Sequence, residues 1–195
     1  MHGLMLRSLQ GYLRDTFGAV SWDAIVRASG LGVSHFEAML PYDLTHADRL
    51  AAAASTVLRR PTEALWEDMG TYLVTNQAYE GMRRLLRFGG TGFVDFLHSL
   101  EDLPDRARLA LPDLTVPDLA VEEVQAAHFR LTYRFHVAGT GPVLLGILRA
   151  MADDYGTLAL IDLEHSGEGG GVISIQVLKM HHAKARPFVL VRPVM

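Results

Sequence analysis

Apolar residues recur every three to four positions through most of the first 110 residues. This spacing places them on one face of an α-helix, and glycine or proline interrupts it at intervals. Gly18 and Gly30 are expected to end the first two helices, and Pro61 follows the fourth. The pattern predicts five helices before residue 90, at residues 4–17, 21–29, 34–40, 44–60 and 62–88.

Residues 93–117, with the sequence FVDFLHSLEDLPDRARLALPDLTVP, join this helical part to the rest of the chain. Their first half carries an apolar face that predicts a helix over residues 93–103. Pro104 has no amide hydrogen and its ring collides with the carbonyl one turn back, so that helix is expected to stop or bend there. About one more turn has room before Pro112 and Pro117 impose extended chain.

Beyond residue 117 apolar and polar positions alternate, which is typical of strands with one buried face. Four strands are expected, at residues 119–124, 128–137, 157–165 and 171–180. Short links join them into two hairpins, and helical spacing returns between the hairpins at residues 141–156. The sequence therefore predicts an α+β fold, a helical amino-terminal half packed on a carboxy-terminal half with a four-stranded antiparallel sheet. The tail, residues 181–195, is expected to add an edge strand or to be disordered.

Composition narrows the functional classes. The chain has 195 residues, 49% of them hydrophobic, which supplies the core of one large domain. A net charge of −4 argues against a nucleic-acid surface, and the absence of cysteine excludes disulfides and thiolate metal sites. No apolar run reaches the roughly 18 residues of a membrane span, and the amino terminus lacks a signal-peptide pattern. We therefore expect a cytoplasmic protein.

The charged clusters are interpreted as solvent-facing. Arg83, Arg84 and Arg87 are consistent with one solvated helix face, and the acidic pair Asp153–Asp154 with another. No nucleophile–base pair, phosphate-binding loop or metal signature is recognisable. We therefore expect no enzymatic activity, no catalytic residue and no metal site.

Several segments, in unbroken order along the chain, carry a family resemblance. They are MHGLMLRSLQGYLRDTFG, SWDAIVRASGL, LWEDMGTYLV, FVDFLHSLEDL with LALPDLTVPDL, and LTYRFHVAGTGPVLLGILRAMADDYG. Together they resemble the haem nitric oxide/oxygen-binding family, abbreviated H-NOX or HNOB. The resemblance implies one H-NOX domain over residues 1–180, divided into a helical subdomain at about 1–62 and helices plus sheet at about 63–180. It also implies haem b between the halves, nitric oxide or oxygen sensing, and a bacterial signalling partner such as a histidine kinase or diguanylate cyclase.

The haem-contacting positions of that family carry different residues in this chain. Pro104 stands where the resemblance places the proximal His, and proline offers iron no lone pair. Tyr133 keeps the first position of the family's Y-x-S-x-R motif, which holds the haem propionates, but Phe135 and Val137 take the other two. Alternate strand residues share a face, so all three are expected to point at the haem edge. Two carboxylates placed there would lose hydration without charged partners, at a cost of several kcal/mol.

Other positions of the family's pocket are retained. Pro117 matches the proline beneath the haem, and Met5 and Leu9 offer apolar lining. Among the histidines, His35 is the best placed as an alternative axial ligand, although it would bind from the opposite side.

Three functional hypotheses remain. The first is a regulatory domain of this family that has exchanged its haem for an apolar small molecule or a filled core. It is favoured because the iron ligand and the propionate clamp are lost together. The second is a haem-binding NO or O2 sensor with a non-standard axial ligand. The third is an enzyme, for which the sequence offers no recognisable site.

Overall fold

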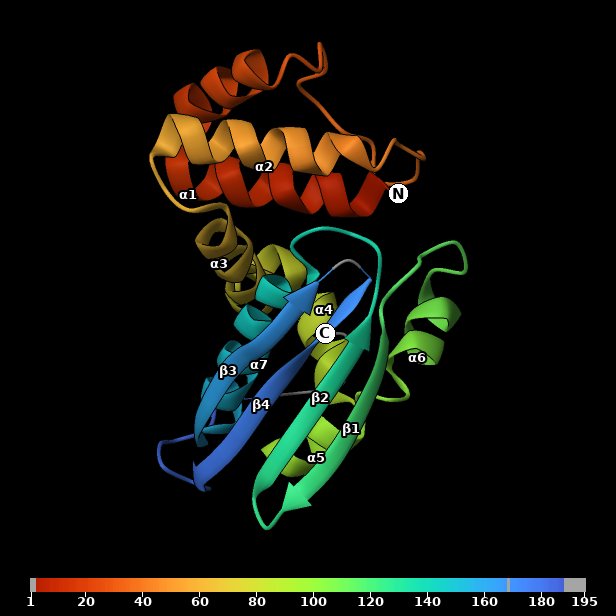
Figure 1. The fold of residues 1–195 in the computed structure, drawn as a ribbon, viewed down its shortest axis with the longest axis vertical. Helices are drawn as coiled ribbons and strands as arrows, with labels where there is room; N and C mark the ends of the chain where they lie inside the picture. The colour runs from red at the N-terminus through yellow and green to blue at the C-terminus, as the bar shows by residue number, and fades with distance from the viewer. Residues whose placement is uncertain (1–2, 168, 188–195) are drawn as a thin grey trace, which may run out of the picture.

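The computed structural model describes residues 3–167 and 169–187. A helical half lies against a half built from helices and an antiparallel sheet (Figure 1), and the predicted α+β class is confirmed. In chain order the described elements are α1 (Gly3–Ser29), α2 (Thr45–Leu58), α3 (Thr62–Thr75), η1 (Gln77–Tyr79), α4 (Glu80–Arg87), α5 (Phe93–His98), α6 (Leu103–Ala110), β1 (Asp118–Gln125), β2 (His128–Arg134), α7 (Thr140–Tyr155), β3 (Leu158–Gly167) and β4 (Gly170–Lys179).

The amino-terminal half is built from α1, α2 and α3. α1 is kinked at Gly18, whose φ of 85° lies in the left-handed region that glycine tolerates best. α1 and α2 lie side by side at the top of Figure 1 and bury their apolar faces together with that of α3. This amino-terminal core consists of Leu6, Leu9, Tyr12, Leu13, Trp22, Ile25, Phe36, Ala47, Leu50, Ala51, Ala53, Ala54, Leu65, Trp66, Met69 and Leu73.

The helix predicted at residues 34–40 is wrong, because this segment forms turns and irregular chain. The side-chain oxygen of Gln10 accepts the backbone N–H of Phe36 at 3.0 Å. The backbone oxygen of Ser34 accepts the indole N–H of Trp22 at 3.1 Å. The Phe36 ring is fully buried in the amino-terminal core. Contacts to residues far away in the sequence thus fix a non-helical backbone and override local propensity.

The single helix predicted over residues 62–88 is divided at Asn76. This residue is extended, with φ −80° and ψ 133°, and its side-chain oxygen accepts the N–H of Ala78 at 2.8 Å. Asparagine competes with helical hydrogen bonding through such local contacts. The result is two helices, α3 and α4, separated by the short η1.

Pro104 begins a helix rather than ending one, which corrects the prediction for residues 93–103. α5 ends at His98, and the carbonyl of Ser99 accepts the guanidinium of Arg106 at 2.6 Å. Pro104 lies in the first turn of α6, where a backbone N–H would have no helical partner. The missing amide hydrogen therefore costs nothing at this position.

Both predicted hairpins are confirmed, as β1–β2 and β3–β4, and the strand order is β1-β2-β4-β3. The two hairpins are joined through β2 and β4, which pair antiparallel with Leu131 opposite Ile173. β2 ends at Arg134, three residues before the predicted end at Val137. Arg134 lies opposite Gly170, the first residue of β4, so beyond Arg134 no residue of β4 is available to pair with β2.

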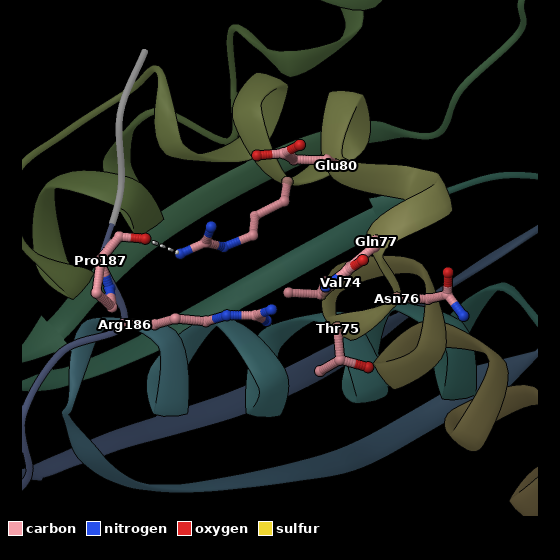
Figure 2. Close-up of a pocket in the computed structure, with 8 residues that line it drawn as sticks. Val74, Thr75, Asn76, Gln77, Glu80, Arg186 and Pro187 are labelled. Atoms are coloured by element: carbon pink, nitrogen blue, oxygen red, sulfur yellow. Dashed lines mark hydrogen bonds between the residues drawn. The ribbon is translucent and has the colours of Figure 1, made fainter. Parts of the chain in front are cut away.

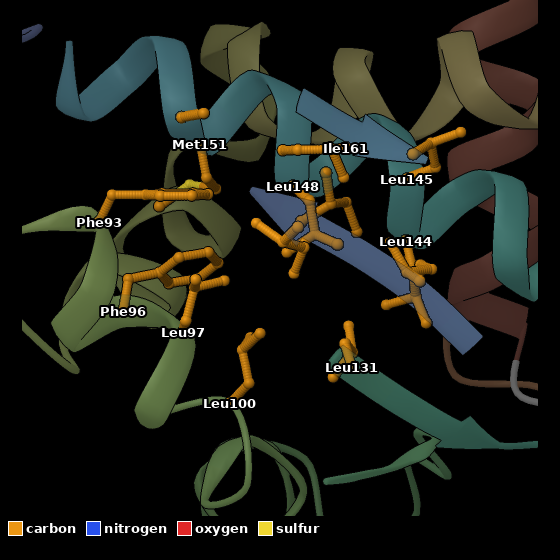
Figure 3. Close-up of a cluster of buried hydrophobic side chains, with 14 of the residues drawn as sticks. Phe93, Phe96, Leu97, Leu100, Leu131, Leu144, Leu145, Leu148, Met151 and Ile161 are labelled. Carbon is orange, nitrogen blue, oxygen red and sulfur yellow. The ribbon is translucent and has the colours of Figure 1, made fainter. Parts of the chain in front are cut away.

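α5 and α7 cover one face of the sheet, and their side chains meet in a second core (Figure 3). Phe96 and Leu97 of α5 point toward Leu148 and Met151 of α7, above Leu131 of the sheet. This carboxy-terminal core consists of Val74, Leu86, Phe93, Phe96, Leu97, Leu100, Leu119, Phe129, Leu131, Tyr133, Leu144, Leu145, Ile147, Leu148, Ala150, Met151, Ala152, Tyr155, Ile161, Ile173, Ile175 and Val177.

The helices α3 and α7 cross at close range and connect the two halves. Gly70 of α3 lies against the backbone oxygen of Val143, and Gly146 of α7 lies against the backbone oxygen of Glu67. A methyl group on either glycine would overlap that oxygen. Val143 also packs against both cores, so this crossing is where they meet.

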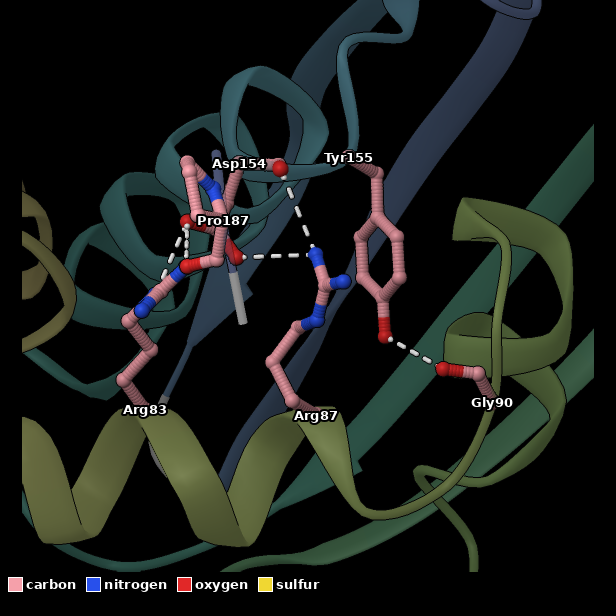
Figure 4. A network of polar contacts seen from close by, with 6 residues as sticks. All are labelled: Arg83, Arg87, Gly90, Asp154, Tyr155 and Pro187. Atoms are coloured by element: carbon pink, nitrogen blue, oxygen red, sulfur yellow. Dashed lines mark hydrogen bonds and ion pairs between the residues drawn. The ribbon is translucent and has the colours of Figure 1, made fainter. Parts of the chain in front are cut away.

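A buried ion-pair network occupies the far end of α7, so the expectation of solvated charges is wrong for Arg83, Arg87 and Asp154, while Asp153 is exposed (Figure 4). The carboxylate of Asp154 accepts hydrogen bonds from Arg83 Nε at 2.8 Å and from Arg87 Nη1 at 3.0 Å. The side chains of Asp154 and Arg83 are only 2% and 9% exposed. The network also holds the segment after β4, because Arg83 donates to the backbone oxygen of Pro187 at 3.1 Å and the N–H of Arg186 donates to Asp154 O at 2.9 Å.

Residues 181–187 form turns and irregular chain, so the described part of the tail contains no edge strand. Residues 188–195, the rest of that predicted tail, lie outside the described residues.

Candidate functional site

A cavity of about 230 Å³ lies between the two cores, and we call it the central cavity. It is lined by Leu4, Met5, Ser8, Leu9, Ala47, Trp66, Met69, Leu73, Tyr79, Met82, Leu103, Leu114, Thr115, Val116, Pro117, Phe135, Ala138, Gly139, Thr140, Val143, Leu144 and Ile147.

Three helices present one face each to the central cavity, at the 3–4 spacing that places side chains on a common side. These faces are Leu4, Met5, Ser8 and Leu9 of α1, Trp66, Met69 and Leu73 of α3, and Thr140, Val143, Leu144 and Ile147 of α7. The extended residues 114–117 close another side, because α6 has ended and β1 has not yet begun. Since these walls come from both halves, filling the cavity bears on how the halves pack.

The chemistry of the lining is apolar and uncharged. None of its described residues is Asp, Glu, Lys, Arg or His. The polar side-chain groups are the hydroxyls of Ser8, Thr115, Thr140 and Tyr79 and the indole N–H of Trp66, and the soft donors are the thioethers of three methionines. A few polar groups in an apolar wall are typical of a site for a small organic molecule.

This lining does not fit a haem held by a proximal histidine and a basic propionate clamp. Such a haem needs an imidazole at the iron, and its two carboxylates need cationic partners or water. The described lining supplies neither an imidazole nor a cation. The volume of about 230 Å³ lies between that of a benzene-binding cavity, about 150 Å³, and the lower bound of drug-sized sites, about 300 Å³.

Four of the predicted pocket residues, Met5, Leu9, Pro117 and Phe135, line the central cavity. Pro104 does not. It is buried in the first turn of α6, and its neighbour Leu103 faces the cavity instead.

Tyr133 and Val137 lie elsewhere. The Tyr133 hydroxyl is within hydrogen-bond distance of Ser166 Oγ, 3.0 Å away, and its ring packs against Gly141 and Gly171. Val137 lies past the end of β2, and its backbone oxygen accepts the hydroxyl of Thr140 at 2.6 Å. Tyr133, Phe135 and Val137 therefore do not lie together, which corrects the expectation that all three share one face of a strand.

His35 is at the surface and does not belong to the described lining of the central cavity. Its ring nitrogens lie 3.0 Å from Arg7 Nη1 and 3.2 Å from a Glu37 carboxylate oxygen. These contacts form a small surface cluster on the amino-terminal half.

Sequence reasoning missed most of the lining, including Trp66, Met69, Tyr79, Met82 and Val143. Helical periodicity identifies Trp66 and Met69 as inward-facing. It does not distinguish a side chain that fills the core from one that borders a cavity, because both lie on the same apolar face.

Comparisons with known proteins agree with the fold. The model of a family described as haem-NO-binding, HNOB, matches residues 2–162. Soluble guanylate cyclase gcy-31 of Caenorhabditis elegans is 23% identical over 169 residues, covering 85% of this chain and 24% of that protein. Soluble guanylate cyclase 89Db of Drosophila melanogaster is 21% identical over 155 residues, covering 80% and 23%. The chain thus spans about a quarter of the length of these relatives.

Solved structures are similar over nearly the whole chain. The Fe(II) unliganded H-NOX protein from K. algicida has a TM-score of 0.78 at 19% identity, covering 94% of this chain and 100% of that one. An H-NOX protein from S. oneidensis in the Fe(II)NO ligation state has a TM-score of 0.76 at 12% identity, covering 92% and 100%. At this identity the likeness shows a shared fold.

Among residues 3–167 and 169–187, no helix has the length and hydropathy that crossing a bilayer requires.

Proposed function

This chain belongs to the haem-NO-binding family, and on that premise we propose that it is a regulatory sensor domain whose central cavity takes a small, uncharged, apolar ligand in place of histidine-ligated haem. The single observation that supports this proposal is the apolar, charge-free lining of a cavity located between two cores. A neutral ligand can enter such a lining by the hydrophobic effect alone, whereas a carboxylate would lose its hydration without a partner.

The signalling step we propose is a shift of the helical half against the sheet half when the cavity is filled. Two helices lead from the cavity to the ion-pair network at the far end of α7. On α4, Met82 lines the cavity and its neighbour Arg83 binds Asp154. On α7, Ile147 lines the cavity two turns before Asp154. A ligand that prefers one packing of the halves would thereby change the surface around residues 183–187.

We further propose that this surface is read by a bacterial histidine kinase, diguanylate cyclase or guanylate cyclase in the cytoplasm, and that the domain itself performs no catalysis. Family membership and the cyclase relatives support a signalling partner. The central cavity supports binding rather than turnover, because its described lining contains no acid–base pair and no activated nucleophile.

The proposal is tested with a pair of probes that differ mainly in charge, octan-1-ol and octanoate at pH 8. We expect octan-1-ol to raise the melting temperature of the purified protein in a saturable way, because a ligand of the folded state alone stabilises it. Octanoate should have little effect. Equal stabilisation by both probes, or by neither, would contradict an uncharged apolar site.

A second candidate is a haem sensor with a non-standard axial ligand. The observation that favours it is the presence of Tyr79, Met5, Met69 and Met82 in the lining, since phenolate and thioether groups ligate haem iron in other proteins. Expression with ample haem, followed by haem titration, separates the two candidates. A sharp Soret band at one haem per chain supports this candidate, and a colourless protein that still responds to octan-1-ol supports the first.

A further inference from the structure

A second cavity, of about 460 Å³, lies on the other side of α4, and we call it the arginine cavity (Figure 2). Its volume lies within the range of small-molecule sites. Its walls are the end of α3, η1, the start of α4 and the segment after β4. It is lined by Val74, Thr75, Asn76, Gln77, Glu80, Arg83, Arg186 and Pro187. None of these residues lines the central cavity.

Positive charge is concentrated around the arginine cavity. Asp154 is the counter-ion of two guanidinium groups, those of Arg83 and Arg87, and Glu80 pairs with Arg84 at 3.2 Å. Among the described residues that line the cavity, the charged side chains are those of two arginines, Arg83 and Arg186, and one carboxylate, Glu80. The chain as a whole has a net charge of −4, so this local excess of positive charge is the opposite of its average. Such a potential favours anions.

Arg186 is held by its backbone and extends its side chain into the cavity. Its N–H donates to Asp154 O at 2.9 Å. Figure 2 shows the side chain running across the cavity toward Val74 and Thr75. Within the described part of the chain the guanidinium of Arg186 has no hydrogen bond or ion pair, and a guanidinium is a planar fork that matches carboxylate and phosphate oxygens.

Neutral donors complete the wall opposite Arg186. The side-chain oxygen of Asn76 is occupied by the N–H of Ala78, so its NH₂ group is the part that remains to donate. Gln77 adds a second amide. Amide and guanidinium donors around a positively charged cavity match an oxyanion that has several acceptor oxygens.

We propose that the arginine cavity is a second ligand site, independent of the central cavity, that binds a small oxyanion of the carboxylate or phosphate class. The guanidinium of Arg186 and the amide groups of Asn76 and Gln77 hold it. Because the site is formed jointly by the α3–α4 connection and residues 186–187, the anion also fastens that segment to the domain.

The test is a thermal-shift and calorimetric titration of the full chain with inorganic phosphate and, separately, with succinate, each at constant ionic strength set by chloride. We expect a saturable rise in melting temperature with at least one of the two. A response to phosphate alone or to succinate alone identifies the chemical class of the ligand.

Arg186→Ala should raise the dissociation constant of that anion at least tenfold, and Arg186→Lys should weaken it less, because the charge stays while the fork is lost. Arg186→Ala keeps its backbone hydrogen bond to Asp154, so the fold is expected to persist. Arg130→Ala, which removes an exposed arginine of β2, is the matched control and should bind like the parent.

An anion response that is absent from the parent, or unchanged in Arg186→Ala, overturns the proposal. The response to octan-1-ol should be the same in all variants, so failure here is distinguishable from failure of the central-cavity proposal.

Discussion

At the scale of single residues, the carboxylate of Asp154 forms the most deeply buried of the described ion pairs. It is the partner of both Arg83 and Arg87, and all three side chains are largely buried. Arg87 also lies over the ring of Tyr155, with its guanidinium carbon 4.0 Å from the ring centroid. Removing one member of a buried pair leaves an uncompensated charge, which costs more than the pair itself contributes.

We expect Asp154→Asn to lower the free energy of unfolding by about 3–5 kcal/mol, because two buried guanidinium groups lose their counter-ion. Urea unfolding followed by circular dichroism measures this. The matched control is Asp105→Asn, which breaks an exposed pair with Arg108 on α6 and should change the free energy of unfolding by less than about 1 kcal/mol. Similar losses in both variants would show that the Asp154 network is not a buried one.

We expect ionisation of Tyr155 to lower the free energy of unfolding at alkaline pH. Burial raises the pKa of its phenol above the ordinary value, and its hydroxyl donates to the backbone oxygen of Gly90 at 3.1 Å. A raised folded-state pKa means that the unfolded chain releases its proton first. The stabilisation is therefore complete below about pH 10 and declines as the pH rises toward the folded-state pKa.

Urea unfolding of the parent and of Tyr155→Phe at a series of pH values tests this. The variant should be less stable at pH 8 by about 1 kcal/mol, through loss of the hydrogen bond to Gly90. Its stability should also fall less steeply above pH 10 than that of the parent. Part of the slope should remain, because burial also raises the pKa values of Tyr12 and Tyr72. An unchanged slope in the variant would exclude Tyr155 as a source.

The sequence could not predict this network. Arg83 and Arg87 are four residues apart on a helix, and polar side chains in that pattern usually face solvent. Their burial depends on Asp154, 71 residues away from Arg83. A pattern within one helix contains no information about a partner at that distance.

At the scale of elements, the α3–α7 crossing determines how the two halves meet. Gly70 and Gly146 let the backbones approach until each lies against a carbonyl oxygen of the other helix. A packed interface of this kind tolerates little added volume.

Gly70→Ala is expected to destabilise the protein by about 1–3 kcal/mol, because its methyl group overlaps the backbone oxygen of Val143. Gly81→Ala in α4 is the matched control, for which we expect the opposite change in stability. Gly81 is exposed with nothing near its added methyl group, so alanine there should stabilise the helix by about 0.5–1 kcal/mol. Thermal unfolding of both variants measures the pair, and a neutral Gly70→Ala would mean that the two helices readily move apart.

Elements with strong periodicity were predictable, and junctions between them were not. The helix at 141–156 and the two hairpins follow from spacing and turn residues. Pro104 was misread because proline breaks a helix interior and also starts a helix, and the two roles differ only in where the first turn begins. The segment 34–40 has helical composition, but Gln10 and Trp22 hold it by hydrogen bonds.

At the scale of the whole molecule, the central cavity lies where the two halves meet. Its lining includes members of both cores, such as Leu9 and Met69 on one side and Leu144 and Ile147 on the other. Sequence predicted the members carried by the family resemblance, Met5, Leu9, Pro117 and Phe135. The remaining walls depend on the tertiary packing of α3, α4 and α7.

Ala47→Phe should fill the central cavity, because Ala47 lies in its wall on α2 and the added ring is the size of benzene. We expect the melting temperature to stop responding to octan-1-ol while the circular dichroism spectrum stays that of the parent. Ala52→Phe, at an exposed position of the same helix, should keep the response. A full octan-1-ol response in Ala47→Phe would place the binding site elsewhere.

The strand order has a consequence for how the chain is made. The buried members of the amino-terminal core all lie within residues 6–73, so these side chains leave the ribosome early in translation, before Val143 of α7, which also packs against them. The sheet must wait for β4, which is the last of the described strands to be synthesised and pairs with both β2 and β3. Until then the nascent chain holds a folded helical half and strands with unsatisfied edges, the kind of surface that chaperones protect.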